Sequence, residues 1–155
     1  MHPDKSFMQE AILIARMGKS AGESPIGAVV VIDGEIISTE HTSLQTHNDP
    51  SAHAEMLALR AAAKKMKSRY LEGAVLYTTL EPCPMCTSAA IWAKCEMIVY
   101  GAKQEDAIEA DQDPQSPTSF RQIRIKAKYI VERGTPIIEI AESFMRAECL
   151  QLLSN

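Results

Sequence analysis

The sequence predicts an α/β protein, a three-layer α/β/α sandwich built around a central mixed sheet. Two observations lead to this fold class. A β-branched run over residues 26–32 is followed by Asp33-Gly34 and a second strand pattern over residues 35–39, which together indicate a β-hairpin. After the hairpin, helical and strand patterns alternate along the chain, as they do when helices cover both faces of a sheet.

A helix is expected before the hairpin. Ser6 and Gln9 have the spacing of a capping box, in which each side chain accepts a hydrogen bond from a free backbone N–H group. Apolar residues then recur at helical intervals, and Gly18 or Gly22 ends the pattern.

A second helix is expected after a polar loop over residues 40–47. Asp49-Pro50 predicts its start, because an acidic N-cap followed by proline at the first helical position is a common helix beginning. The alanine- and leucine-rich pattern continues to about residue 67. His53 and Glu55 would therefore lie in the first two turns of this helix.

The second half of the chain alternates in the same way. Strands are expected over residues 74–79, 97–100 and 136–140, and helices over residues 84–93 and 141–153. Between them, residues 104–117 are acidic and show little periodicity, and residues 118–133 fit a helix or a strand equally well. The length of 155 residues, without a repeat or linker, predicts a single domain over residues 1–155.

The composition is that of a soluble globular protein, with 46% hydrophobic and 23% charged residues. No apolar run reaches the roughly 18 to 20 residues of a membrane span, and the N-terminus lacks the layout of a signal peptide. A cytoplasmic location is therefore expected. The net charge of −4 argues against a large nucleic-acid surface but leaves room for a local one, since one stretch is rich in basic residues: Arg121, Arg124, Lys126, Lys128 and Arg133.

Three side chains have the types and spacing of a metal site. Cys83 and Cys86 form a C-x-x-C pair flanked by prolines, and His53 lies thirty residues upstream. Three protein ligands with an open fourth position are typical of a catalytic Zn²⁺, whereas a structural zinc needs a fourth ligand. Neither candidate for that fourth ligand, His47 or Cys95, has the usual spacing. The remaining cysteine, Cys149, is interpreted with Cys95 as a small buried hydrophobic residue.

Glu55 follows the histidine by two residues, so its side chain can reach a metal-bound water without being a ligand, and it is the candidate general acid/base. The combined pattern, H-x-E followed by P-C-x-x-C, resembles the cytidine-deaminase-like superfamily of zinc-dependent deaminases. The resemblance implies the same three-layer fold and hydrolytic release of ammonia from a ring carbon that carries an amino group. It implies that Glu55 moves the protons.

Within the superfamily, residues 25–31, 48–55 and 81–86 look like both guanine deaminases and tRNA adenosine deaminases. Asn48-Asp49-Pro50 and residues 90–93 and 100–103 are more similar to the guanine and guanosine branch, so a guanine-like purine is the favoured substrate. The alternatives are a tRNA adenosine deaminase, a deaminase of free cytosine or another amino-heterocycle, and an inactive zinc-stabilised binding module. An intact Glu55 argues against the last, because a structural zinc does not require that carboxylate.

Substrate contacts are expected from Thr42, Asn48 and Asp113. Thr42 stands where the guanine deaminases carry an asparagine that grips the base, and a threonine cannot reproduce the pairing of an amide. This substitution predicts that guanine itself is a weak substrate. The expected partners are a small amino-heterocycle and a second copy of the chain in a homodimer, with the region after Gly101 in the interface.

Overall fold

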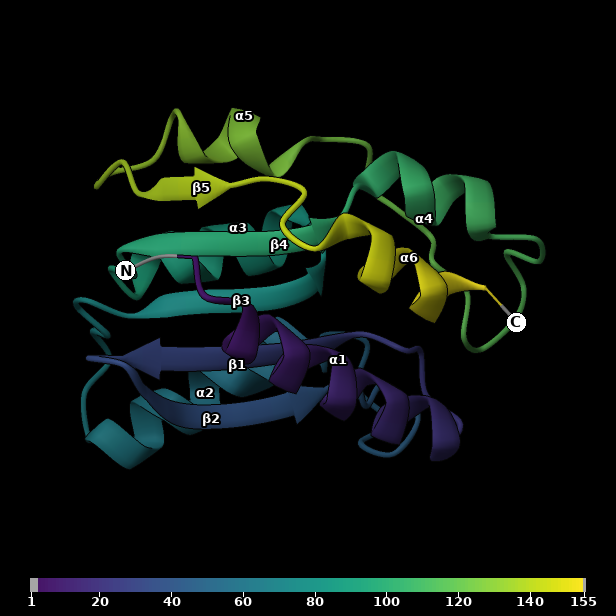
Figure 1. Cartoon of the computed structure of the whole chain (residues 1–155), viewed down its shortest axis with the longest axis horizontal. Helices are drawn as coiled ribbons and strands as arrows, with labels where there is room; N and C mark the ends of the chain where they lie inside the picture. The colour runs from purple at the N-terminus through teal and green to yellow at the C-terminus, as the bar shows by residue number, and fades with distance from the viewer. Residues whose placement is uncertain (1–2, 155) are drawn as a thin grey trace.

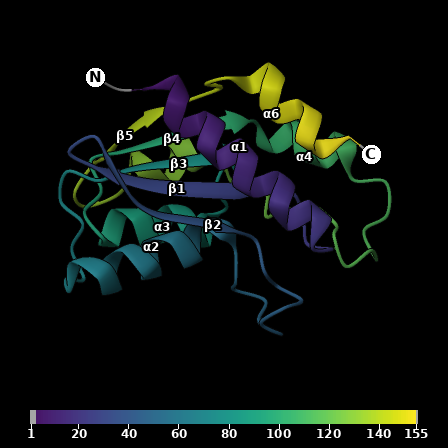
Figure 2. The same cartoon turned by 60° about the horizontal axis from the view of Figure 1, so that its bottom comes forward.

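The computed structural model describes residues 3–154 and has the predicted three-layer architecture (Figures 1 and 2). A five-stranded sheet has the order β2-β1-β3-β4-β5. Its strands are β1 (Gly27–Ile32), β2 (Glu35–His41), β3 (Val75–Leu80), β4 (Met97–Ala102) and β5 (Glu139–Ala141). β1 is antiparallel to both β2 and β3, whereas β3, β4 and β5 are parallel, so the sheet is mixed as expected.

Six helices cover the two faces of the sheet: α1 (Lys5–Ser20), α2 (Ala54–Met66), α3 (Pro84–Trp92), α4 (Gln104–Ala110), α5 (Ala127–Val131) and α6 (Arg146–Leu153). Figure 2 shows α1, α4 and α6 above the sheet and α2 and α3 below it. Alternate residues of β1 belong to two hydrophobic cores, one on each face of the sheet: Val29 and Val31 pack on the side of α1, while Ala28 and Val30 pack on the side of α2.

The predicted hairpin is confirmed. Asp33 and Gly34 join β1 to β2 with φ angles of 51° and 74°. Positive φ at both central positions is what a tight two-residue hairpin turn requires, and glycine and aspartate are among the residues that tolerate it.

Two predicted helix starts are wrong. The first helix is capped by Asp4, whose carboxylate accepts hydrogen bonds from the backbone N–H and the hydroxyl of Ser6, so Ser6 is not the cap. The second begins at Ala54, not at Asp49-Pro50. The Asp49 carboxylate accepts from Ser51 instead, and the chain makes a turn before the helix.

The segment after β4 is the largest departure from the expected elements. Residues 104–110 form α4, although the sequence there showed little periodicity. Residues 111–126 have no regular secondary structure and run past the end of the sheet where β3 and β4 finish, at the right of Figure 1. None of the helices within residues 3–154 has the length and apolar character that crossing a membrane requires.

Candidate functional site

The predicted metal ligands meet at the beginnings of two helices. His53 is the residue before α2 and Cys83 is the residue before α3, both in extended conformation, and Cys86 lies in the first turn of α3. The side chains of His53 and Cys83 make no capping hydrogen bond to their own helices. They are therefore free to point toward one another instead of toward the backbone.

The three ligand atoms form a compact cluster. The Nδ1 atom of His53 lies 3.6 Å from the Sγ atoms of both Cys83 and Cys86, and all three atoms lie within 4.8 Å of one another. Within the described residues 3–154, the cluster contains no fourth histidine, cysteine or carboxylate ligand. One imidazole and two thiolates are a common zinc donor set, and three ligands leave one coordination position open. His53, Cys83 and Cys86 are thus positioned to hold a zinc ion.

The electrostatics of the cluster favour a thiolate at Cys83. Hydrogen bonding with the Cys86 thiol lowers the pKa of Cys83 to about 4, despite partial burial. Hydrogen bonding with Cys83 raises the pKa of His53. Hydrogen bonding with Cys83 and burial both raise the pKa of Cys86. Because zinc binds thiolates, loading the site expels the proton that Cys86 retains. The positive ends of the two helix dipoles favour the resulting negative charge.

Glu55 lies beside this cluster. It is the second residue of α2 and is 4% exposed. Burial raises the pKa of its carboxyl group to about 7, an effect that the nearby His53 opposes. A carboxyl group with a pKa near neutrality can both accept and donate a proton at physiological pH.

A cavity of about 160 Å³ opens above these residues. His53, Glu55 and Cys83 lie in its lining and, with Cys86 beneath them, form what we term the pocket floor. Four residues of the irregular segment form one side, which we term the pocket wall: Ser119, Phe120, Arg121 and Gln122. The rest of the lining comes from the ends of strands and the loop before α2: Ser24, Ile26, Thr42, Leu44, Pro50, Leu80 and Glu81.

Only one of the three predicted substrate contacts lines this cavity. Thr42 does so, and its hydroxyl oxygen accepts a hydrogen bond from the backbone N–H of Ala54 at 3.2 Å. Thr42 thereby satisfies a free N–H group at the start of α2 that His53 does not cap. Asn48 is an exposed turn residue with φ of 48°, and the Asp113 carboxylate accepts from the backbone N–H of Gln115, so both lie outside the lining.

The pocket wall was not predicted as part of the site. Its signal in the sequence is weak, a single aromatic residue, Phe120, beside Arg121 in a stretch without periodicity. The wall is placed by contacts between residues far apart in the chain. The Lys126 ammonium group, for example, lies 2.8 Å from the carboxylate of Glu81.

Comparisons with known proteins agree with this site. Residues 1–102 match the zinc-binding region of cytidine and deoxycytidylate deaminases, a stretch that contains all three metal ligands and Glu55. The chain belongs to this family. The matched region contains all the residues of the pocket floor, whereas the pocket wall lies beyond it.

Relatives within the family fall into two groups. The chain is 48% identical to a tRNA-specific adenosine deaminase of Bacillus subtilis over 154 residues, which cover 99% of this chain and 88% of that protein. It is 43% identical to a guanine deaminase of the same organism over 110 residues, 70% of each chain. A solved structure from a study of A-to-I editing by tRNA:A34 deaminases superposes with a TM-score of 0.76 at 28% identity, covering 96% of this chain and 99% of that one.

The protein is therefore a zinc-dependent hydrolytic deaminase that acts on a nucleobase or nucleoside, as the sequence predicted. The comparisons support the tRNA alternative better than the guanine-like purine that the sequence favoured. The short motifs that pointed to guanine lie almost entirely within residues 1–102, the stretch that matches the family as a whole.

Proposed function

We propose that this deaminase converts adenosine to inosine in the anticodon loop of a tRNA. The observation that carries the proposal is the extent of similarity: the match to a tRNA-specific adenosine deaminase runs through 99% of the chain, past the zinc-binding region and through the pocket wall. The match to a guanine deaminase covers 70% of the chain.

The shape of the pocket supports a base presented from a larger molecule. Its volume of about 160 Å³ is below the roughly 300 Å³ at which pockets begin to enclose a drug-sized ligand. A single base therefore fits inside, while its sugar and phosphates remain at the mouth. Phe120 offers a ring for stacking the base, and Arg121, which is exposed, offers a charge to a phosphate.

The floor residues have separate roles in the proposed reaction. His53, Cys83 and Cys86 would hold the zinc, which would act as a Lewis acid and make a water molecule more acidic. Glu55 takes a proton from the attacking water and delivers it to the ring nitrogen next to the carbon under attack. It then passes the second water proton to the amino group, which leaves as ammonia, so one water is consumed and an oxo group replaces the amine.

Guanine deamination is the second candidate, because the similarity to a guanine deaminase includes the whole pocket floor. Thr42 is the residue that separates the candidates. Its hydroxyl oxygen already accepts from the Ala54 N–H, which leaves one O–H donor and one lone pair on a single atom for a substrate. One donor suits a ring-nitrogen acceptor of a purine and cannot match the paired donors and acceptors of the guanine edge.

The deciding experiment measures inosine formation in an anticodon stem–loop RNA with adenosine at the wobble position. Free adenosine, guanosine, guanine and cytosine are assayed for ammonia release beside it. The proposal predicts a kcat/KM for the RNA at least about 100-fold above that of every free compound, since binding energy from the rest of the loop is available only to the RNA. Efficient turnover of guanine with no inosine in the RNA would replace the proposal with the second candidate.

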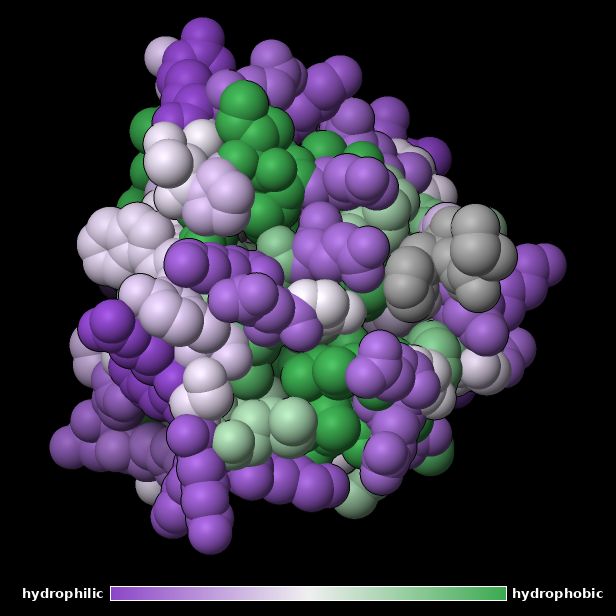
Figure 3. Space-filling view, turned by 90° about the vertical axis from the view of Figure 1, so that its left-hand side faces the viewer, coloured by the Kyte–Doolittle hydropathy of each residue, from purple (hydrophilic) through white to green (hydrophobic). Residues whose placement is uncertain are grey.

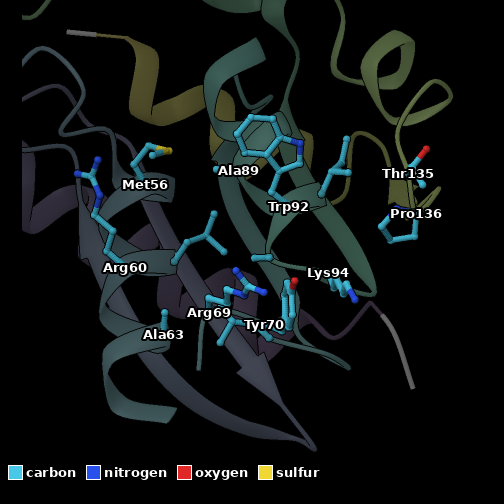
Figure 4. A pocket seen from close by; sticks show the side chains of 14 residues that line it. Met56, Arg60, Ala63, Arg69, Tyr70, Ala89, Trp92, Lys94, Thr135 and Pro136 are labelled. Atoms are coloured by element: carbon cyan, nitrogen blue, oxygen red, sulfur yellow. The ribbon is translucent and has the colours of Figure 1, made fainter. Parts of the chain in front are cut away.

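We also propose that the protein is a homodimer, joined through the face of α2 and α3. Trp92 at the end of α3 is 78% exposed and stands beside a hollow of about 610 Å³ (Figure 4). Met56 and Arg60 of α2 line the hollow, and Tyr70 lies between Arg69 and Lys94 on its other side.

A projecting ring and a hollow on one face make that face self-complementary under two-fold symmetry. The sequence-based prediction that the region after Gly101 contributes to the interface stays a prediction; in that region Asp106 forms an ion pair with Arg146 of the same chain. Figure 3 shows further hydrophobic side chains among hydrophilic ones at the end of the molecule opposite the pocket wall.

Light scattering at micromolar concentration should give a dimer for the wild type and a monomer for Trp92→Ala. A monomeric wild type would contradict the proposal.

A further inference from the structure

Glu81 is a buried carboxylate between the pocket floor and the pocket wall. It follows β3 directly and precedes the zinc ligand Cys83 by two residues. Its backbone N–H donates to the carbonyl of Ala102 at 2.8 Å, which fixes its main chain to the end of β4. Its side chain is 1% exposed. A carboxylate buried this deeply needs partners for its charge and its lone pairs.

All of the partners of this carboxylate come from the two ends of one chain excursion, residues 104–127. Oε1 accepts from the backbone N–H of Gln104 at 2.9 Å and from the Lys126 ammonium group at 2.8 Å. Oε2 accepts from the backbone N–H of Ala127 at 2.9 Å. One side chain therefore holds Gln104, where this segment begins, and Lys126 and Ala127, where it ends.

Gln104 extends this connection to the pocket wall. Its side-chain nitrogen donates to the carbonyl of Ile123 at 2.6 Å, and Ile123 is the residue that follows the wall. The other end of the wall is held by a hydrogen bond from the Ser119 hydroxyl to the Asp111 carboxylate at 2.9 Å. The wall has no regular secondary structure, so side-chain bonds such as these, together with the packing of Phe120 against the core, hold its backbone.

Lys126 provides an internal comparison, because it contacts two carboxylates. It lies 2.8 Å from Glu81, whose side chain is 1% exposed, and 2.7 Å from Glu105, whose side chain is 59% exposed. Exposed ion pairs are screened by water and contribute little, whereas removing one partner of a buried pair leaves the other unsatisfied. The two contacts of one lysine should therefore have very different consequences.

We propose that Glu81 is a positioning residue for substrate selection: its carboxylate holds the pocket wall over the floor, and substrate affinity depends on it. The inference rests on the proposed function only in taking the cavity above the zinc ligands as the substrate pocket. It does not depend on which base enters. Glu81 lines the cavity, but the hydrogen bonds of its carboxylate go to residues 104, 126 and 127 and not to Glu55 or the three metal ligands, so loosening it affects the wall before it affects the chemistry.

The test compares Glu81→Gln with Glu105→Gln as the matched control. In Glu81→Gln, backbone hydrogen exchange over residues 111–126 should become about tenfold faster or more, because a charge-assisted hydrogen bond in a buried site is lost. KM should rise by about tenfold, with kcat changed by less than about threefold and zinc retained at one ion per chain. Glu105→Gln should match the wild type in exchange, KM and zinc content.

Hydrogen exchange needs no substrate, so it decides the inference even if the stem–loop RNA is not deaminated and the proposed function fails. KM is measured with whichever compound of the panel is turned over. Unchanged exchange over residues 111–126 in Glu81→Gln would overturn the proposal. Loss of zinc together with a fall in kcat at unchanged KM would also overturn it, because Glu81 would then serve the metal ligand Cys83 and not the wall.

Gln104→Ala keeps the proposal testable if Glu81→Gln does not fold. This variant leaves the backbone bond to Glu81 in place and removes the side-chain bonds to the carbonyls of Ile123 and Ile125. Faster exchange confined to residues 111–126, with zinc retained, is the expected result. Exchange equal to that of the wild type would contradict the proposal, as unchanged exchange in Glu81→Gln would.

Discussion

The floor of the pocket stands on the first residues of two helices, whereas the wall is a stretch of chain without regular secondary structure. His53 and Cys83 occupy N-cap positions whose backbone is fixed by α2 and α3 behind them. The stretch that contains Phe120 and Arg121 is held at Ile123 by Gln104, and its return to α5 is held at Ala127 by Glu81. In our account the floor carries the chemistry and the wall carries the choice of substrate.

The largest expected effect on the floor is the loss of metal. The purified protein should contain about one zinc per chain, and His53→Ala and Cys83→Ser should each contain almost none, because two ligands do not make a stable site. Elemental analysis measures this. Cys95→Ser, which changes a buried cysteine away from the cluster, is the control and should retain zinc. Normal zinc in His53→Ala would break the three-ligand assignment.

The second effect on the floor is on turnover alone. Glu55→Gln should keep its zinc and lose roughly 10²- to 10⁴-fold in kcat, because an amide cannot carry the proton. Steady-state ammonia release and zinc content are measured together. Glu35→Gln, an exposed carboxylate on β2, should behave as the wild type. A Glu55→Gln enzyme within tenfold of the wild type would mean that another group moves the proton.

Thr42 lies where the floor and the rest of the pocket meet, and its effect should be intermediate. Thr42→Asn should raise kcat/KM for guanine by about threefold to tenfold, since the amide restores a pairing that one hydroxyl cannot offer. Thr42→Ser keeps the hydroxyl and should behave as the wild type. If the wild type already deaminates guanine at ordinary enzymatic efficiency and asparagine changes nothing, Thr42 does not select the substrate.

Arg121 should give the smallest effect, and one that is confined to a charged substrate. Arg121→Ala should lower kcat/KM for the stem–loop RNA by roughly threefold to tenfold, without changing turnover of a free base. It should also reduce the slope of log affinity against log salt concentration by about one. Arg16→Ala on α1 is the matched control, because Arg16 is exposed and does not line the pocket. An equal loss on a free base would show that Arg121 shapes the pocket and does not contact phosphate.

The same contrast explains how far the sequence predicts the structure. The hairpin at Asp33-Gly34 and the cluster of His53, Cys83 and Cys86 are encoded by neighbouring residues with demanding chemistry, and both predictions are confirmed. The helix start at Asp49-Pro50 failed because an aspartate can cap a turn as well as a helix, and only the following residues decide between them.

The pocket wall could not be predicted because its contacts are distant in the sequence. Glu81 and Lys126 are 45 residues apart, and nothing in either segment specifies that they meet. Residues 81–86 were interpreted as part of the deaminase resemblance, and no contact was assigned to Glu81. Substrate contacts assigned to Asn48 and Asp113 fell outside the lining for the same reason: position along the chain did not reveal the direction in which these loops turn.

The most direct test of the division between floor and wall is single-turnover deamination at saturating substrate in Phe120→Ala. Removing the stacking ring should weaken substrate binding by about 5- to 150-fold, in keeping with about 1 to 3 kcal/mol per stacked base. The rate at saturation should stay within about threefold of the wild type, because the floor is intact. A saturating rate lowered as far as that of Glu55→Gln, with zinc retained and binding unchanged, would contradict the account.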